Sequence, residues 1–189
     1  MKLSNEQAVL NLLLKDRTVN HNSLTLSKII GISHAGTFKI LKRLEKNDIV
    51  NTRRIGNTVV YSLNIDNPVT VKLLETILTI EAQISKRWIE EFKPVKDKSL
   101  FVILFGSILN NEKSARDIDI LIVSDKKRFN DIKSIIEDKN NISNKKIHLI
   151  LQTLKEFNQD YLKNNKVILD ILKRGIVLFG QNKFVEVIK

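Results

Sequence analysis

The stretch Phe101-Val-Ile-Leu-Phe105-Gly106-Ser107, followed later by Asp117-Ile-Asp119-Ile-Leu-Ile-Val123, decides the fold of this chain. Each apolar run has the length of a strand, and the Gly-Ser pair between them is typical of a tight turn that leads into a short helix. Side chains two positions apart on a strand share a face at roughly 7 Å, so Asp117 and Asp119 can converge on one divalent cation. Gly106 allows close approach of a ligand, and the turn at Ser107 offers N–H groups that can hold a phosphate.

The sequence from this strand through Gly106-Ser107 to Asp117-Ile118-Asp119 resembles the signature of the DNA polymerase β-like nucleotidyltransferases, particularly their minimal members. The resemblance covers roughly residues 97–180 and implies a mixed sheet with flanking helices. It also implies that Gly106 and Ser107 hold the triphosphate of a nucleoside triphosphate. In the same way, it implies that Asp117 and Asp119 bind Mg²⁺ for attack on the α-phosphorus.

The third carboxylate of that family is expected on a later strand, where this chain reads Lys146-Ile-His148-Leu-Ile-Leu151. Period-two alternation puts Lys146, His148 and Ile150 on one face, so His148 occupies the carboxylate position. Carboxylates offset the charge of the cations in a two-metal site, and replacing one by a neutral imidazole weakens the second metal position. His148 can instead ligate a metal, act as a base, or be a buried strand residue without a ligand role.

Other residues near this motif extend the predicted α/β unit. Arg116 can offset the charge of Asp117 or approach a phosphate. Apolar spacing predicts helices over 128–138, from near 154, and over 167–173, and a final strand over 176–179.

Composition sets outer bounds on function. The 189 residues contain no cysteine, which excludes disulfides, thiolate metal sites and a cysteine nucleophile. No apolar run is long enough for a transmembrane helix, and the N-terminus does not read as a signal peptide, so we expect a cytoplasmic protein without a membrane partner. The net charge of +11 favours a polyanionic partner, although a solvated lysine-rich surface would give the same number.

The first 66 residues predict three helices and a hairpin. Ser4 to Gln7 can form a capping box for a helix that ends near Asp16, Thr25–Ile30 forms a second, and Ser33 can cap a third that ends near Asn47. Phe38, Leu41 and Leu44 form the predicted core stripe of the third helix. Residues 49–63 then predict two strands joined by a Gly56-Asn57 turn.

This arrangement resembles the winged helix-turn-helix domains of archaeal and bacterial transcription regulators, and the resemblance implies binding of double-stranded DNA. In such domains the third helix enters the major groove and the hairpin contacts the backbone. Residues expected in the groove are Ser33, His34, Thr37 and Lys39. Residues expected at phosphates are Lys42, Arg43, Arg53, Arg54 and Asn57. The alternative is a protein-docking module with a merely solvated basic surface.

A long helix is predicted from Pro68 to about Phe92, within a connecting segment at residues 67–96. Its apolar positions nearly follow the spacing of a coiled-coil seam and comprise Leu73, Ile77, Ile80, Ile84 and Trp88. The segment can form a homodimer, or it can pack within the monomer. Pro94 is expected to end the helix before the third region, residues 97–189.

The overall prediction is an α+β chain with an N-terminal winged helix-turn-helix, a connecting helix and a nucleotidyltransferase-fold domain. Three functions follow from it. The first is a DNA-binding, transcription-regulating protein whose second domain binds nucleotide and Mg²⁺. The second is an active nucleotidyltransferase that transfers a nucleoside monophosphate to a protein or another acceptor; minimal members of the family are often antitoxin partners of helical HEPN proteins. The third is a DNA-binding protein with a degenerate scaffold domain.

Overall fold

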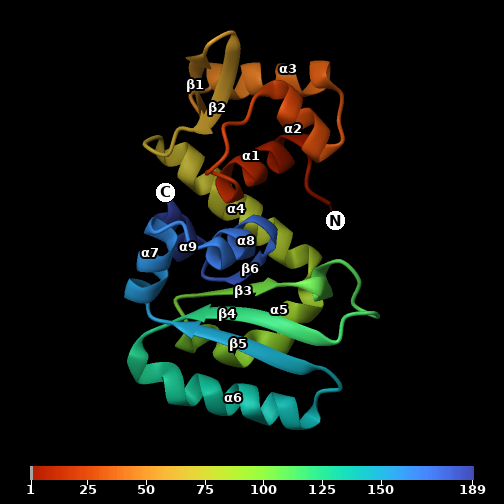
Figure 1. The fold of residues 1–189 in the computed structure, drawn as a ribbon, viewed down its shortest axis with the longest axis vertical. Coiled ribbons are helices and arrows are strands. Elements are labelled where there is room, and N and C mark those ends of the chain that lie inside the picture. The colour runs from red at the N-terminus through yellow and green to blue at the C-terminus, as the bar shows by residue number, and fades with distance from the viewer. Residues whose placement is uncertain (1) are drawn as a thin grey trace. The chain divides into compact units, whose positions relative to one another are not determined.

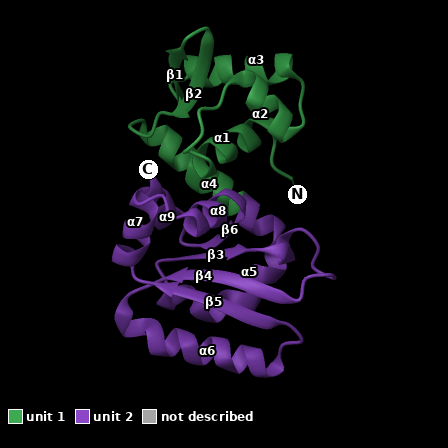
Figure 2. Cartoon of the chain, in the orientation of Figure 1, with its two compact units in different colours: residues 1–80 green, residues 81–189 purple. Residues whose placement is uncertain are grey.

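The computed structural model describes residues 2–189 and divides into two compact units, coloured separately in Figure 2. The first unit ends at Ile80, and the second runs from Glu81 to Lys189. The first contains a two-stranded sheet and the second a four-stranded one. The chain is therefore an α+β protein, as the sequence predicts.

The first unit contains three helices and an antiparallel hairpin, followed by the larger part of α4 (Pro68–Ile84) (Figure 1). Its other elements are α1 (Asn5–Lys15), α2 (Ser23–Ile30), α3 (His34–Lys46), β1 (Val50–Ile55) and β2 (Thr58–Leu63). Ser4 and Gln7 form the predicted capping box of α1, and Gly31 ends α2 in the left-handed conformation at φ 77°. These local signals explain the element boundaries, because each satisfies backbone groups that a helix end leaves unpaired.

The core-facing side of α3 differs from the prediction. Phe38 is 45% exposed, whereas Thr37 is fully buried together with Leu41 and Leu44. Successive residues of an α-helix are rotated by about 100°, so a face built on Thr37 turns Phe38 to the rim, where Lys42 lies over its ring. The buried Thr37 hydroxyl donates to the Ser33 carbonyl at 3.1 Å, which makes a polar residue tolerable in the core.

His21 fixes the connection between α1 and α2. The residue is buried, and Nε2 of its ring lies 3.4 Å from a carboxylate oxygen of Asp16. Its carbonyl accepts the Tyr61 N–H at 2.8 Å, which attaches this connection to β2. Both contacts lie within the fold, so they give this histidine a structural role.

The single helix predicted over 68–92 is wrong, because the chain forms α4 (Pro68–Ile84) and α5 (Lys86–Phe92). Ser85 separates them with φ −101° and ψ 36°, outside helical geometry. The α-helix ends at Phe92, two residues before Pro94, as predicted, and Pro94 itself lies in the following 3₁₀ helix η1 (Lys93–Lys98). Ile77 and Trp88 are buried, so the predicted seam is not a continuous exposed stripe, and homodimer formation stays a prediction.

The second unit is built on a mixed four-stranded sheet of order β5-β4-β3-β6. Its strands are β3 (Phe101–Phe105), β4 (Asp117–Val123), β5 (Lys146–Gln152) and β6 (Ile176–Phe179). β3 runs antiparallel to both β4 and β6, whereas β4 and β5 are parallel. The remaining elements are the 3₁₀ helices η2 (Ser107–Leu109) and η3 (Lys126–Arg128), and the helices α6 (Phe129–Ile142), α7 (Leu154–Leu162), α8 (Lys166–Arg174) and α9 (Gln181–Ile188).

Helices pack on both faces of this sheet. Ile118, Ile120 and Ile122 of β4 belong to a core cluster with Trp88 of α5 and Ile132 of α6. On the other face, the ring of Phe101 packs edge-on against Phe157 of α7 and Phe184 of α9, with centroids 5.1 and 5.6 Å apart. The two layers leave the start of β4 and β5, next to the end of β3, as the place where polar side chains gather.

Among residues 2–189, no helix has both the length and the apolar character needed to cross a membrane.

Candidate functional site

Asp117 and Asp119 lie on one face at the start of β4. Their side chains are 34% and 25% exposed, whereas Ile118 and Ile120 between and beyond them are buried on the opposite face. The alternation of the strand therefore keeps both carboxylates accessible while the isoleucines anchor the strand in the core.

His148 completes a three-residue cluster from the neighbouring strand. The parallel register of β4 and β5 pairs His148 with Asp119. Its Nδ1 lies 3.5 Å from Oδ2 of Asp117 and 3.4 Å from Oδ1 of Asp119. One ligand atom from each of the three residues falls within 4.8 Å of the others, which is close enough for a shared metal ion. The ring is half-exposed, so it is not the buried strand residue that was one alternative.

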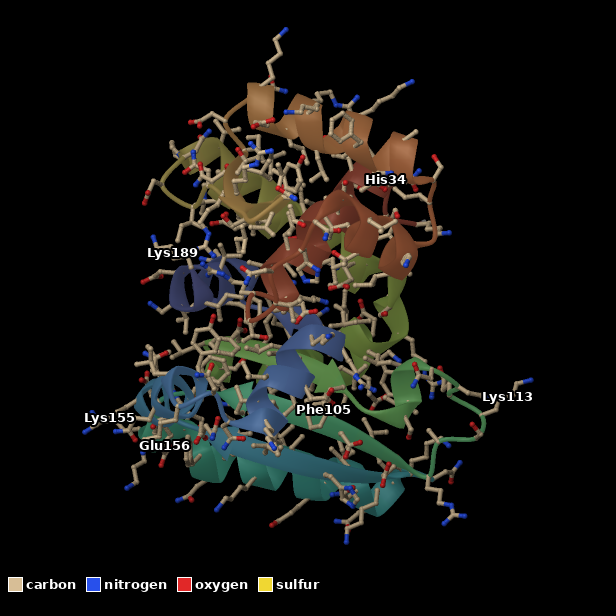
Figure 3. The ribbon with its side chains drawn as sticks, turned by 45° about the horizontal axis from the view of Figure 1, so that its top comes forward. His34, Phe105, Lys113, Lys155, Glu156 and Lys189 are labelled. Carbon is tan, nitrogen blue, oxygen red and sulfur yellow. The ribbon has the colours of Figure 1, made fainter. Side chains whose placement is uncertain are left out.

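Gly106 lies directly beside this cluster. Phe105, the last residue of β3 and labelled in Figure 3, pairs with Asp119. The chain then turns at Gly106 with φ 85° and ψ −165°. A Cβ atom at this position would lie 2.1 Å from Oδ2 of Asp119. Glycine suits this position, because other residues rarely adopt this backbone conformation and a Cβ atom would have to displace the Asp119 carboxylate.

Ser107 begins η2, a single 3₁₀ turn rather than an α-helix, and its side chain is exposed. Leu109 donates its N–H to the Gly106 carbonyl at 3.3 Å, and Asn111 donates to that of Ser107 at 3.2 Å. These two backbone hydrogen bonds stabilise the turn beside the carboxylates. A hydroxyl at its start is available to a ligand.

The electrostatics of the cluster favour a cation. Burial raises the pKa of Asp119, and the nearby charge of Asp117 raises it further, while the His148 ring opposes the shift. Two carboxylates this close resist being ionised together, and a bound cation would remove that cost. The donors fit a divalent metal ion, because carboxylate oxygens and imidazole nitrogens are common metal ligands.

Two basic residues lie at the same edge. Arg116 is exposed and precedes Asp117 directly. Lys146 is exposed, pairs with Asp117 in the register and lies on the same face of β5 as His148. Sequence reasoning placed Lys146 on this face but did not name it as a site residue. The alternation of the strand predicts which face of β5 carries Lys146. The register that places Lys146 opposite Asp117 is seen only in the structure.

The residues predicted to contact DNA lie on α3 and the hairpin of the first unit. Lys39, Lys42 and Arg43 are exposed on α3, and Arg53, Arg54 and Asn57 are exposed on the hairpin. Two of these basic side chains have acidic partners within the unit: Lys42 pairs with Glu45 at 2.8 Å, and Arg43 pairs with Glu6.

The four residues expected in the groove, which lie at or near the start of α3, have different environments in the structure. Ser33 caps the helix by accepting the Gly36 N–H, and His34 is exposed with Nε2 2.8 Å from the Ser23 hydroxyl (Figure 3). Thr37 is fully buried, so its assignment to the groove is wrong. A side chain that packs in the core and bonds to Ser33 cannot reach a base edge. Lys39 remains on the exposed side.

Comparison with known protein families matches the model of the nucleotidyltransferase domain to residues 81–178, so this chain belongs to that family. The match begins where the second unit begins and includes α5, whose Trp88 and Phe92 lie in the core of that unit. No curated protein and no solved structure matches the chain.

Proposed function

We propose that the second unit binds a nucleoside triphosphate together with a divalent cation, and that the first unit binds double-stranded DNA as a winged helix-turn-helix. The nucleotide part depends on one observation. Asp117, Asp119 and His148 bring metal-ligating atoms within 4.8 Å of one another, beside a turn at Gly106 where a Cβ atom would meet the Asp119 carboxylate.

The roles of the individual residues follow from their chemistry. The carboxylates of Asp117 and Asp119 hold the cation, which supplies positive charge to the phosphates when it is bound. Gly106 and Ser107 line the phosphate position with backbone and hydroxyl groups. Arg116 and Lys146 add positive charge at the same edge and draw in an anionic ligand.

Binding is proposed in preference to transfer because of His148. Group transfer from a nucleoside triphosphate depends on anionic residues that hold the cations and assist removal of the proton from the acceptor. A neutral imidazole brings no negative charge to the position opposite Asp119. A bound nucleotide would thus act as a signal for a regulatory protein rather than as a consumed substrate.

The DNA part is supported by the exposed basic surfaces of α3 and the hairpin. Lys39 points away from the buried side of the helix, and Arg53 and Arg54 lie on the strand that leads into the Gly56-Asn57 turn. Such residues attract a polyanion and release its counterions on binding.

Thermal unfolding tests the nucleotide part. A nucleoside triphosphate at millimolar concentration, with Mg²⁺ or Mn²⁺, is expected to raise the melting temperature of the parent protein, because a ligand stabilises the state that binds it. The variant Asp117→Ala with Asp119→Ala should lose this shift. The matched control, Asp97→Ala with Asp138→Ala, removes the same charge from exposed positions of the same unit and should keep it. No shift with any of the four common ribonucleotides and either cation would remove the proposal. Pyrophosphate release that the first variant abolishes would establish transfer instead.

Salt dependence of binding tests the DNA part. Arg53→Ala with Arg54→Ala should weaken binding to all duplex sequences alike and reduce the slope of log K against log salt by about 2. Lys126→Ala with Lys127→Ala removes the same charge from η3 of the second unit and should leave the slope unchanged. An equal effect of both pairs, or salt-independent binding, would contradict the assignment.

A further inference from the structure

The nitrogen ligand distinguishes this cluster from a site made only of carboxylates. Nδ1 of His148 faces both aspartates, 3.4 Å from Oδ1 of Asp119 and 3.5 Å from Oδ2 of Asp117. These separations are longer than the roughly 2.9 Å of a normal N–H···O hydrogen bond. The ring is therefore directed at the carboxylates without being closed onto either of them.

The separations suit three ligands of one cation. Two ligand atoms that each lie about 2.1 Å from a metal are about 3.0 Å apart at a right angle and about 3.4 Å apart at a tetrahedral angle. The two nitrogen–oxygen distances, 3.4 and 3.5 Å, match the tetrahedral spacing, and the ligand atoms of all three residues lie within 4.8 Å of one another. Nδ1 of His148 therefore already lies at a ligand-to-ligand spacing from each carboxylate.

The ligand types discriminate between metals. Mg²⁺ has a strong preference for oxygen ligands and loses its bound water reluctantly, so an imidazole contributes little to its binding. First-row transition dications accept imidazole nitrogen and carboxylate oxygen together. Replacing a carboxylate by His148 therefore lowers the affinity for Mg²⁺ more than the affinity for Mn²⁺ or its neighbours in the series.

The charge of the cluster points to a single cation. Two carboxylates and a neutral imidazole carry two negative charges, which one dication neutralises. A third carboxylate would leave an excess negative charge able to attract a second cation, and His148 supplies none. A neutral metal-bound cluster also repels the phosphates of an incoming nucleotide less than an anionic one would.

We propose that Asp117, Asp119 and Nδ1 of His148 bind one first-row transition-metal dication in preference to Mg²⁺. This inference rests on the proposed function, since it names the metal of the same site. His148 is then a metal ligand that sets the choice of metal, and the departure from a third carboxylate is a change of specificity rather than a loss of the site.

Mn²⁺ is a suitable probe, because its electron paramagnetic resonance signal measures binding and its electron spin echo modulation detects directly coordinated nitrogen. The parent protein should bind Mn²⁺ at least roughly tenfold more tightly than Mg²⁺, measured by competition, and should show ¹⁴N modulation. His148→Asp should lose the ¹⁴N modulation and lower the Mn²⁺-to-Mg²⁺ affinity ratio by roughly tenfold. Asn130→Asp adds one negative charge at an exposed position of α6, which packs on the opposite face of the sheet, and should change neither quantity.

The outcomes separate this inference from the proposed function. Mg²⁺ binding as tight as Mn²⁺ binding in the parent, or bound Mn²⁺ without ¹⁴N modulation, would overturn the metal assignment while leaving a nucleotide and cation site in place. Binding of neither cation, with or without nucleotide, would overturn both. The nitrogen measurement is made on the parent, so the result does not depend on the folding of any variant.

Discussion

Gly106→Ala is the substitution whose effect the structure defines most closely. The new Cβ would lie 2.1 Å from Oδ2, 3.0 Å from Cγ and 3.2 Å from Cβ of Asp119. The backbone at φ 85° and ψ −165° is also a region that residues other than glycine rarely adopt. Both effects act at the same point, since the residue before Gly106 pairs with Asp119 across the sheet.

The expected loss of stability can be worked from these two effects. A side chain in this backbone region costs about 1–3 kcal/mol. The contact adds to that, because the Asp119 carboxylate must move or the turn must open. We expect the free energy of unfolding of the second unit to fall by about 2–4 kcal/mol. Cation binding should weaken in parallel, because the displaced carboxylate is one of the proposed ligands.

Trp88 provides the assay. It is the single tryptophan of the chain and lies in the core of the second unit, so its fluorescence during urea unfolding reports that unit without interference from the first. Cation affinity is measured on the folded variant by Mn²⁺ resonance.

Gly180→Ala is the matched control. Gly180 also has a positive φ, 73°, and its Cβ would lie 2.0 Å from the Leu100 carbonyl, next to the opposite end of β3. This variant should lose stability but keep the cation affinity of its folded form. If Gly106→Ala keeps both the stability and the cation affinity of the parent, the close packing of this turn against Asp119 is refuted.

Two further predictions concern single groups. Burial and the Asp117 charge raise the pKa of Asp119 above its ordinary value of 3.8, so in metal-free buffer the stability that this carboxyl contributes is greatest below that value and is lost as the pH rises through the raised pKa. As the pH rises from 3.8 through the raised pKa, Asp119→Asn should therefore gain stability relative to the parent. Urea unfolding in EDTA measures the difference in stability between the two proteins, and a difference that does not change with pH would contradict the raised pKa. Thr37→Val removes the bond to the Ser33 carbonyl and should lower the stability of the first unit by about 1 kcal/mol without changing DNA affinity, because the side chain is buried. A loss of DNA affinity at unchanged stability would return this residue to the groove.

The local parts of the fold follow from the sequence. Alternation in β4 separates Asp117 and Asp119 from the isoleucines, and the capping residues Ser4 and Ser33 mark the starts of α1 and α3. These features depend on neighbours within a few residues, where the geometry of a strand or a helix end sets the outcome. The family signature around Gly106 is local in the same sense.

Packing decided what the sequence pattern left open. Phe38 and Thr37 are adjacent, and only the rotation of α3 against the rest of its unit determined which is buried. No proline or glycine near Ser85 indicates the break between the two helices. The break lies just before α5, which buries Trp88 and Phe92 in the second unit. Local propensity favoured a continuous helix here, and tertiary contacts overrode it.

The sequence by itself determined that this chain carries two strand carboxylates behind a Gly-Ser turn, because backbone periodicity and steric freedom act over a few residues. Only the tertiary structure decided that His148 lies opposite Asp119 with its ring directed at both acids. The register between two strands separated by α6 is set by burial of their apolar faces, and a shift by one residue would turn His148 to the other side of the sheet. The sequence determines that the residue at this position is a histidine, but packing places it beside the two carboxylates.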